Sequence, residues 1–129
     1  MPLIRCDYSS QHLSDDHLVK VNKAIFDVSA ELCGYNETDA QNKISIFNSQ
    51  YGPIDHSTAS AEIEVRAKRA EFEGKGISPD EVRSNWLRAY EAALVPLAQE
   101  IDLVAPIIFT VTFEDWEVVV VSASGSVPN

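Results

Sequence analysis

The chain has 129 residues, of which 45% are hydrophobic and 23% are charged, so it has the length of one domain and enough apolar residues to bury a core. Ten Lys and Arg against twenty Asp and Glu give a formal net charge of −10, which argues against general binding to nucleic acid or to an anionic membrane surface. No segment approaches the roughly 18 consecutive apolar residues of a membrane span. The start lacks the basic and apolar regions of a signal peptide, so we expect a cytoplasmic protein.

The first half of the chain predicts a strand, a long helix and a second strand. Residues 3–8 alternate between apolar and polar side chains, which is typical of a short strand. Ser14 is a good N-cap for a helix over 14–33, whose apolar residues recur at helical spacing until Gly34. Alternation returns at 43–47, before a loop.

The second half repeats this pattern with a strand, a helix and a strand, at residues 61–68, 78–101 and 107–113. The helix opens with a capping box, Ser78-Pro79-Asp80-Glu81, and Pro96 is expected to kink its last turns. A last short strand is predicted at 118–121, and the tail from Ser122 is expected to be loose.

The spacing of these elements indicates an internal repeat. The two helix N-caps and the two following strands are each 64 residues apart, since 78 − 14 and 107 − 43 are equal. We therefore expect one α/β (α+β) domain over residues 1–129, built from β-α-β units at 2–60 and 61–121, with 122–129 as the tail. Side by side, the units form a four-stranded, mostly parallel sheet with two helices on one face and short extra strands. We expect the other face to be apolar and uncovered, which predicts oligomerisation.

The cysteines and histidines do not predict a metal site. Cys6 and Cys33 lack the spacing of zinc ligands, and the three histidines are scattered along the chain (His12, His17 and His56). We interpret both cysteines as ordinary thiols of a reduced protein.

Pro2 is the first candidate for chemistry. Methionine is normally removed before a small residue, which would leave the nitrogen of Pro2 as a secondary amine. An α-amino group titrates near about 7.7–8.0, and apolar burial or a neighbouring cation lowers that value. A neutral amine at neutral pH is suited to act as a general base. The alternative is that Met-Pro is simply a common start.

Arg66 and Arg69 are the second candidates. Six of the ten basic residues fall within residues 66–88, and Arg is suited to bidentate contact with a carboxylate. The alternative is a solvated strand end whose arginines pair with Glu62, Glu64, Glu71 and Glu73. A third candidate is the segment Phe113-Glu114-Asp115-Trp116-Glu117, which would place apolar rings and a carboxylate beside one another; the alternative is a strand end and turn with Trp as packing.

Taken in order, these motifs resemble the tautomerase superfamily. The resemblance rests on Pro2 before a short strand, the tandem units, the R-x-x-R of Arg66 and Arg69, and the late Glu114-Asp115-Trp116. Lys23-Ala24-Ile25-Phe26-Asp27 and Ile46-Phe47-Asn48 extend it. Within the superfamily, the chain is most similar to the long members related to cis-3-chloroacrylic acid dehalogenase, and next to malonate semialdehyde decarboxylase.

This resemblance implies a homotrimer whose sheets form a central barrel. It implies that Pro2 is the catalytic amine and that Arg66 and Arg69 bind the carboxylate of a small 2-oxo acid or acrylate. It requires no metal and no cofactor, because the amine and the arginines suffice to stabilise an enolate.

The sequence departs from the dehalogenases at several positions. Ser29 stands where they carry a helix histidine, and Phe109 or Val111 stands where they carry a tyrosine. Glu114 and Glu117 are the candidates for their water-activating glutamate. Hydration needs a group that activates water, whereas tautomerisation needs only an amine and an anion site, so these departures favour proton transfer.

The sequence therefore predicts a cofactor-independent tautomerase or isomerase acting on a small 2-oxo or enol carboxylate. Pro2 is the predicted base, and Phe113 and Trp116 are candidates for the pocket. The alternatives are a hydratase, dehalogenase or decarboxylase on the same scaffold, or a non-catalytic trimeric binding protein. The expected partners are a small anionic substrate and further copies of the chain, without nucleic acid or membrane.

Overall fold

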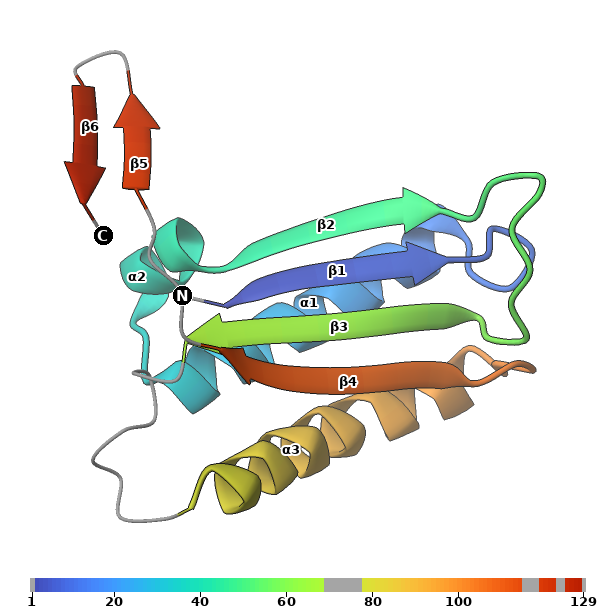
Figure 1. The fold of residues 1–129 in the computed structure, drawn as a ribbon. Helices are drawn as coiled ribbons and strands as arrows, with labels where there is room; N and C mark the ends of the chain where they lie inside the picture. The colour runs from blue at the N-terminus through green and yellow to red at the C-terminus, as the bar shows by residue number, and fades with distance from the viewer. Residues whose placement is uncertain (1, 69–77, 115–118, 123–124, 129) are drawn as a thin grey trace.

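The structure is a computed structural model that describes residues 2–68, 78–114, 119–122 and 125–128 (Figure 1). The elements follow one another in the order β1 (Leu3–Tyr8), α1 (Asp15–Cys33), α2 (Glu37–Lys43), β2 (Ser45–Gln50), β3 (Ala61–Lys68), α3 (Pro79–Glu100), β4 (Ile107–Glu114), β5 (Val119–Ser122) and β6 (Gly125–Pro128).

The first four strands form one mixed sheet in the order β2-β1-β3-β4. Within each β-α-β unit the strands are parallel, so β1 pairs with β2 and β3 pairs with β4. The two units meet through the antiparallel pair of β1 and β3, in which Leu3 lies opposite Arg66. The predicted four-stranded α+β fold is confirmed, and two of its three strand pairings are parallel. The antiparallel centre sets the start of β1 beside the end of β3.

The ends of the long helices follow the predicted capping chemistry. The Ser14 hydroxyl accepts a hydrogen bond from the His17 amide at 3.2 Å, and the Ser78 hydroxyl accepts one from the Glu81 amide at 3.2 Å. Gly34 ends α1 with a φ of 69°, a left-handed conformation that costs glycine little because it has no Cβ. Despite Pro96, α3 continues to Glu100.

Three local features differ from the sequence prediction. A short helix, α2, precedes the second strand and includes Lys43, so β2 covers Ser45–Gln50 instead of 43–47. This helix is capped by Asn36, whose side chain accepts from the amide of Asp39. The tail is not loose throughout, because β6 pairs with β5 in a separate two-stranded sheet.

The core lies between the sheet and the helices α1 and α3, which cover the same face of it (Figure 1). Strict alternation in β3 sends Ile63, Val65 and Ala67 into this core. Other buried side chains come from the neighbouring strands and both long helices: Ile4, Cys6, Val21, Ile25, Trp86, Tyr90, Leu94, Val111 and Phe113.

The expectation of an apolar uncovered face is wrong. The same alternation that buries one side of β3 places polar residues on the other side: Glu62, Glu64, Arg66 and Lys68. On β4 that face carries Ile108, Thr110, Thr112 and Glu114. Large exposed apolar side chains lie on its two edge strands, Phe47 on β2 at 61% exposure and Ile108 on β4 at 47%. The middle of this face is therefore charged, and one large exposed apolar side chain lies on each of its edge strands.

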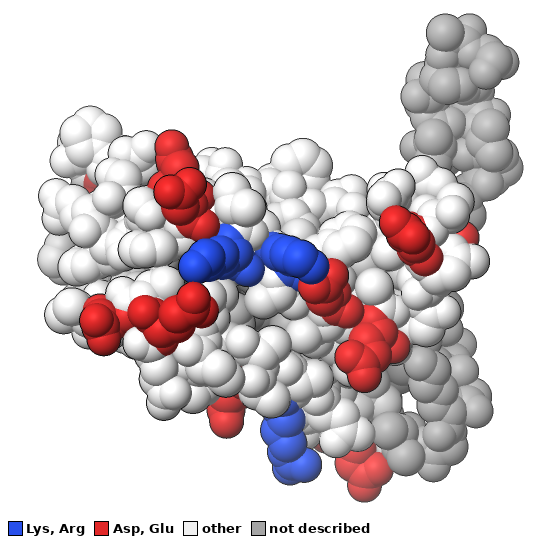
Figure 2. Space-filling model, turned by 180° about the vertical axis from the view of Figure 1, so that it is seen from behind, with Lys and Arg blue, Asp and Glu red and all other residues white. Residues whose placement is uncertain are grey.

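The face seen in Figure 2, on the helix side, has its Lys and Arg side chains among Asp and Glu rather than in a separate basic surface. Lys20 pairs with Glu100 at 3.3 Å, and Lys23 pairs with Asp27 at 2.8 Å. Among the described residues, neither long helix has the apolar length that crossing a membrane requires.

Candidate functional site

One end of the sheet brings together Pro2, Arg66 and Glu114. Pro2 immediately precedes β1, whose Leu3 lies opposite Arg66 near the end of β3. Glu114 ends β4 and lies opposite Lys68 in the register with β3. Pro2 is fully buried, and its carbonyl accepts a hydrogen bond from the amide of Ser45 at 3.3 Å, which fixes the start of β1 against the start of β2. We call this end of the sheet the Pro2 end.

Arg66 is engaged by two carboxylates at the Pro2 end. Its guanidinium Nη2 donates to Oε2 of Glu114 at 2.5 Å, and its Nε lies 3.7 Å from Oε1 of Glu64. The hydrogen bond with Glu114, and then the charge of that carboxylate, raise the pKa of the Arg66 guanidinium above its ordinary value. The glutamate pairing that the sequence offered as an alternative is therefore present at Arg66. The alternative drawn from the sequence named Glu64 but not Glu114 as a partner of the arginines, and the period of two puts Glu64 and Arg66 on one face of β3.

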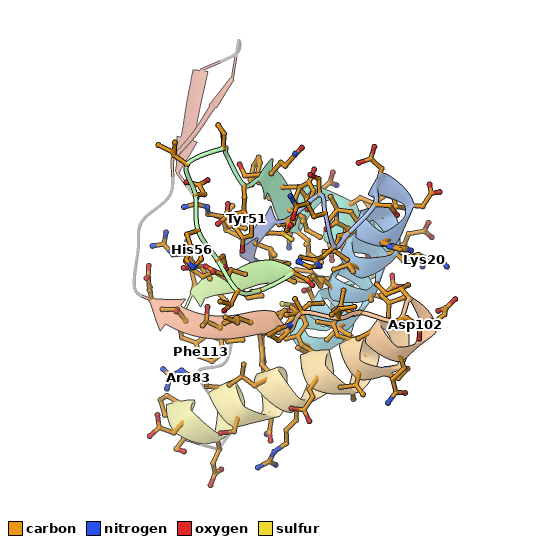
Figure 3. The ribbon with its side chains drawn as sticks, turned by 90° about the vertical axis from the view of Figure 1, so that its right-hand side faces the viewer. Lys20, Tyr51, His56, Arg83, Asp102 and Phe113 are labelled. Atoms are coloured by element: carbon orange, nitrogen blue, oxygen red, sulfur yellow. The ribbon has the colours of Figure 1, made fainter. Side chains whose placement is uncertain are left out.

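Phe113 lies on the opposite, helix-covered side of the same strand end. Its ring packs edge-on against Trp86 with 5.1 Å between centroids, and the guanidinium of Arg83 lies 5.9 Å from the Phe113 centroid (Figure 3). Ala67 separates Pro2 from Phe113 across the sheet, because Ala67 pairs with Phe113 and Leu3 with Arg66. Phe113 is 7% exposed, so it forms part of the core rather than the wall of an open pocket.

Ser29 and Phe109 are brought together by a residue that sequence reasoning missed. The Ser29 hydroxyl, fully buried, donates to the carbonyl of Ile25 at 2.7 Å and lies 2.6 Å from the Tyr90 hydroxyl. The Tyr90 ring stacks on Phe109 with centroids 4.6 Å apart. Burial raises the pKa of Tyr90 well above its ordinary value. A tyrosine on the buried stripe of α3 was the available signal. Val111, the alternative to Phe109, is also in the core.

Four candidate residues lie outside the described residues: Arg69, Asp115, Trp116 and Glu117. Of the predicted arginine pair, Arg66 alone belongs to the part of the chain that the structure describes.

The histidines lie at the end of the sheet away from Pro2. His12 follows β1, His17 is in the first turn of α1, and His56 is in the loop between β2 and β3 (Figure 3). Both cysteines are free thiols, as expected, and burial raises the pKa of Cys6 to about 11. In the part of the chain that the structure describes, no group of three or more His, Cys, Asp or Glu residues is placed to hold a metal ion.

An apolar groove of about 620 Å³ lies between α3 and the start of β4. Its lining includes Leu94, Val104, Ile107 and Phe109, together with Glu91. Ile107 is at the opposite end of β4 from Glu114. The groove is therefore distinct from the Pro2 end, and Phe109 is a predicted site residue that lines it.

Comparison with solved structures defines the fold. A fused 4-OT, described as a wild-type symmetric trimer, matches with a TM-score of 0.60 over 95% of this chain and 93% of its own, at 14% identity. Malonate semialdehyde decarboxylase FG41, inhibited by 3-bromopropiolate, matches with a TM-score of 0.57 over 88% and 83% at 15% identity. A probable enzyme from the thermophilic fungus Aspergillus fumigatus matches with a TM-score of 0.61 over 92% and 80% at 12% identity.

The chain thus has the α+β fold found in structures of the tautomerase superfamily, as the sequence resemblance implied. In particular, its tandem units follow the fold of the fused 4-OT over nearly the whole of both chains. No protein-family model matches the sequence. No curated protein matches it either.

Proposed function

We propose that the chain is a cofactor-independent enzyme that moves a proton within a small 2-oxo or enol carboxylate. Pro2 acts as the base, and Arg66 and Arg69 hold the carboxylate. The observation that carries the proposal is the register of β1 with β3, which sets Leu3 opposite Arg66 and so brings Pro2 to the same strand end.

The chemistry requires that Met1 is removed, since only then does Pro2 have a basic nitrogen. In the enol-to-keto direction, this amine accepts the proton of the enol hydroxyl and returns it to the adjacent carbon, so that no cofactor is consumed. The arginines bind the carboxylate and stabilise the enolate oxygen as its negative charge develops. A cation near the amine favours its neutral form at neutral pH.

A hydratase, dehalogenase or decarboxylase on the same fold is the second candidate. Glu114 favours it, because this carboxylate is at the Pro2 end, within hydrogen-bonding distance of Arg66. The similarity to structures named malonate semialdehyde decarboxylase also supports it. Release of halide from 3-chloroacrylate, or of carbon dioxide from malonate semialdehyde, would distinguish these reactions from tautomerisation.

Ketonisation of phenylenolpyruvate, followed by ultraviolet absorbance, tests the proposal. We expect Pro2→Ala to lower kcat at least tenfold in a protein that stays folded, and an N-terminal extension that acylates the nitrogen of Pro2 to abolish turnover. Intact-mass measurement establishes whether Met1 has been removed. Unchanged kinetics in Pro2→Ala would eliminate Pro2 as the base, whereas an absence of turnover in the wild type would make a non-catalytic binding protein the better interpretation.

The arginine is tested separately with the same substrate. We expect Arg66→Ala to raise KM at least tenfold, because a charge-assisted contact with the substrate is lost. Arg88→Ala is the matched control, since Arg88 is exposed on α3 and outside the Pro2 end. Equal KM values in the two variants would return Arg66 to the role of a strand-end partner for glutamates.

A further inference from the structure

The proposed carboxylate-binding residue already has carboxylate partners within the chain. Arg66 is held by Glu114 from β4 and flanked by Glu64 on its own strand. The side chain of Arg66 is 38% exposed and that of Glu114 is 34% exposed, so solvent and small solutes reach both members of the pair.

Further acids lie along the same uncovered face. Glu62 is on this side of β3, and Asp7 of β1 is its partner in the strand register. Arg5 and Lys68 are the other basic residues at these positions, opposite Glu64 and Glu114 respectively. Among the described residues of this face, Arg66 is one of three bases beside four acids, in a chain whose formal net charge is −10.

We propose that Glu114 is a specificity-determining residue that makes the site prefer monocarboxylates to dicarboxylates. The inference rests on the proposed function, in which Arg66 binds the substrate carboxylate. An incoming carboxylate competes with Glu114 for the guanidinium, and one carboxylate on a small ligand is enough to do so. A second carboxylate on the same ligand is repelled by the charges of Glu114 and Glu64, so dicarboxylates bind more weakly.

The change Glu114→Gln tests this, because it removes the competing charge and keeps the size of the side chain. The probes are phenylenolpyruvate, with one carboxylate, and 2-hydroxymuconate, with two. We expect Glu114→Gln to raise kcat/KM for 2-hydroxymuconate by about fivefold, the upper range for a partly exposed ion pair, and to raise it less for phenylenolpyruvate. The effect diminishes at high salt, since these charges are screened. Glu62→Gln is the matched control, because Glu62 is on the same face but is hydrogen-bonded to Ser57. We expect this variant to leave unchanged the ratio of kcat/KM for 2-hydroxymuconate to kcat/KM for phenylenolpyruvate.

Isothermal titration with pyruvate and 2-oxoglutarate gives a readout that does not need turnover. We expect wild type to bind pyruvate more tightly than 2-oxoglutarate, and we expect Glu114→Gln to reduce the difference between these two affinities. The proposal is overturned if Glu114→Gln changes neither the ratio of the two kcat/KM values nor the ratio of the two affinities. An equal loss of affinity for both ligands also overturns it, because Glu114 would then serve only to position Arg66. If Pro2→Ala abolishes turnover while Glu114→Gln leaves the ratio unchanged, the proposed function stands and this inference fails. If Pro2→Ala is fully active while Glu114→Gln changes the ratio of the two binding affinities, the proposed function fails and this inference stands.

Discussion

At the scale of single residues, the pair of Ser29 and Tyr90 joins the two long helices through a hydrogen bond inside the core. Ser29 already donates to Ile25, so the Tyr90 hydroxyl donates to Ser29. We expect Tyr90→Phe to lower the free energy of unfolding by about 1 kcal/mol, the usual net value of a buried hydrogen bond. Denaturant unfolding measures the loss of stability, and a double-mutant cycle with Ser29→Ala isolates the interaction energy between the two hydroxyls. A coupling of zero would show that the two hydroxyls do not interact.

Cys6 makes a second residue-scale prediction, in the alkaline range. Burial, followed by the charge of Asp7, raises its pKa from 9.0 to about 11. Below pH 9 the thiol is protonated in both the folded and the unfolded chain. As pH rises from 9 towards 11, the unfolded chain loses this proton while the folded protein keeps it, so stability falls.

The measurement compares wild type with Cys6→Ala, which removes the titrating group, in urea unfolding at several pH values. Because two pH units correspond to about 2–3 kcal/mol, we expect the stability advantage of wild type over the variant to shrink by that order across this range. A difference that is constant with pH would contradict the shifted pKa. Tyr35, whose pKa burial raises to about 12, is present in both proteins and so cancels from the comparison.

At the scale of the elements, backbone conformation at the two helix ends gives a matched pair of predictions. Gly34 ends α1 at a φ of 69°, and Asp102 lies beyond the end of α3 at a φ of 51°. A left-handed residue with a Cβ costs roughly 1–2 kcal/mol relative to glycine. We therefore expect Gly34→Ala to destabilise the protein by about 1 kcal/mol and Asp102→Gly to be neutral or stabilising.

The surroundings of Gly34 make its variant a clean test. No atom outside its neighbours lies within 4 Å of where a Cβ would be added, so the cost of Gly34→Ala comes from φ and not from a steric clash. Thermal unfolding measures both variants. A stability equal to wild type in Gly34→Ala would mean that α1 ends without the left-handed turn.

The elements also show what the sequence predicts and what it does not. Both long helices and β3 were predictable, because caps and apolar periodicity agree in them. The helix α2 has seven residues with only Ala40 buried, so it has no apolar stripe to detect. The prediction of an apolar uncovered face was wrong for a different reason. The charged residues of β3 alternate with its apolar residues, so they necessarily lie on the uncovered side of the sheet.

The candidate site was predictable only in part, because its residues come from strands whose pairing the sequence pattern does not specify. The antiparallel pairing of β1 with β3 is a tertiary contact, and it was this pairing that placed Leu3 opposite Arg66. The residue types at the Pro2 end were visible in the sequence. The pairing of Arg66 with Glu114 depends on which strand is adjacent and on its register, and periodicity within one strand does not specify either of these.

At the scale of the whole molecule, the charged middle of the uncovered face and the exposed apolar side chain on each edge strand predict how copies of the chain associate. Phe47 and Ile108 are on β2 and β4, the two edges of the sheet, and the outer edge of each strand is unpaired in the four-stranded sheet. Joining the β2 edge of one copy to the β4 edge of the next would bury both side chains and leave the charged residues facing an interior space. Repetition of such a head-to-tail contact closes a ring.

We therefore expect a homotrimer of about 43 kDa, three times the 14.3 kDa of one chain, held at its sheet edges rather than through an apolar centre. Changing either edge residue, as Phe47→Asp or Ile108→Asp, should shift the protein to monomers at micromolar concentration, because each buries a charge in every interface. Ile54→Asp is the control, since Ile54 is 95% exposed in the loop between β2 and β3 and lies outside both edges. Multi-angle light scattering measures the mass, and circular dichroism establishes that each variant is folded. A monomeric wild type would contradict the trimer, whereas trimers in both edge variants would require a different interface.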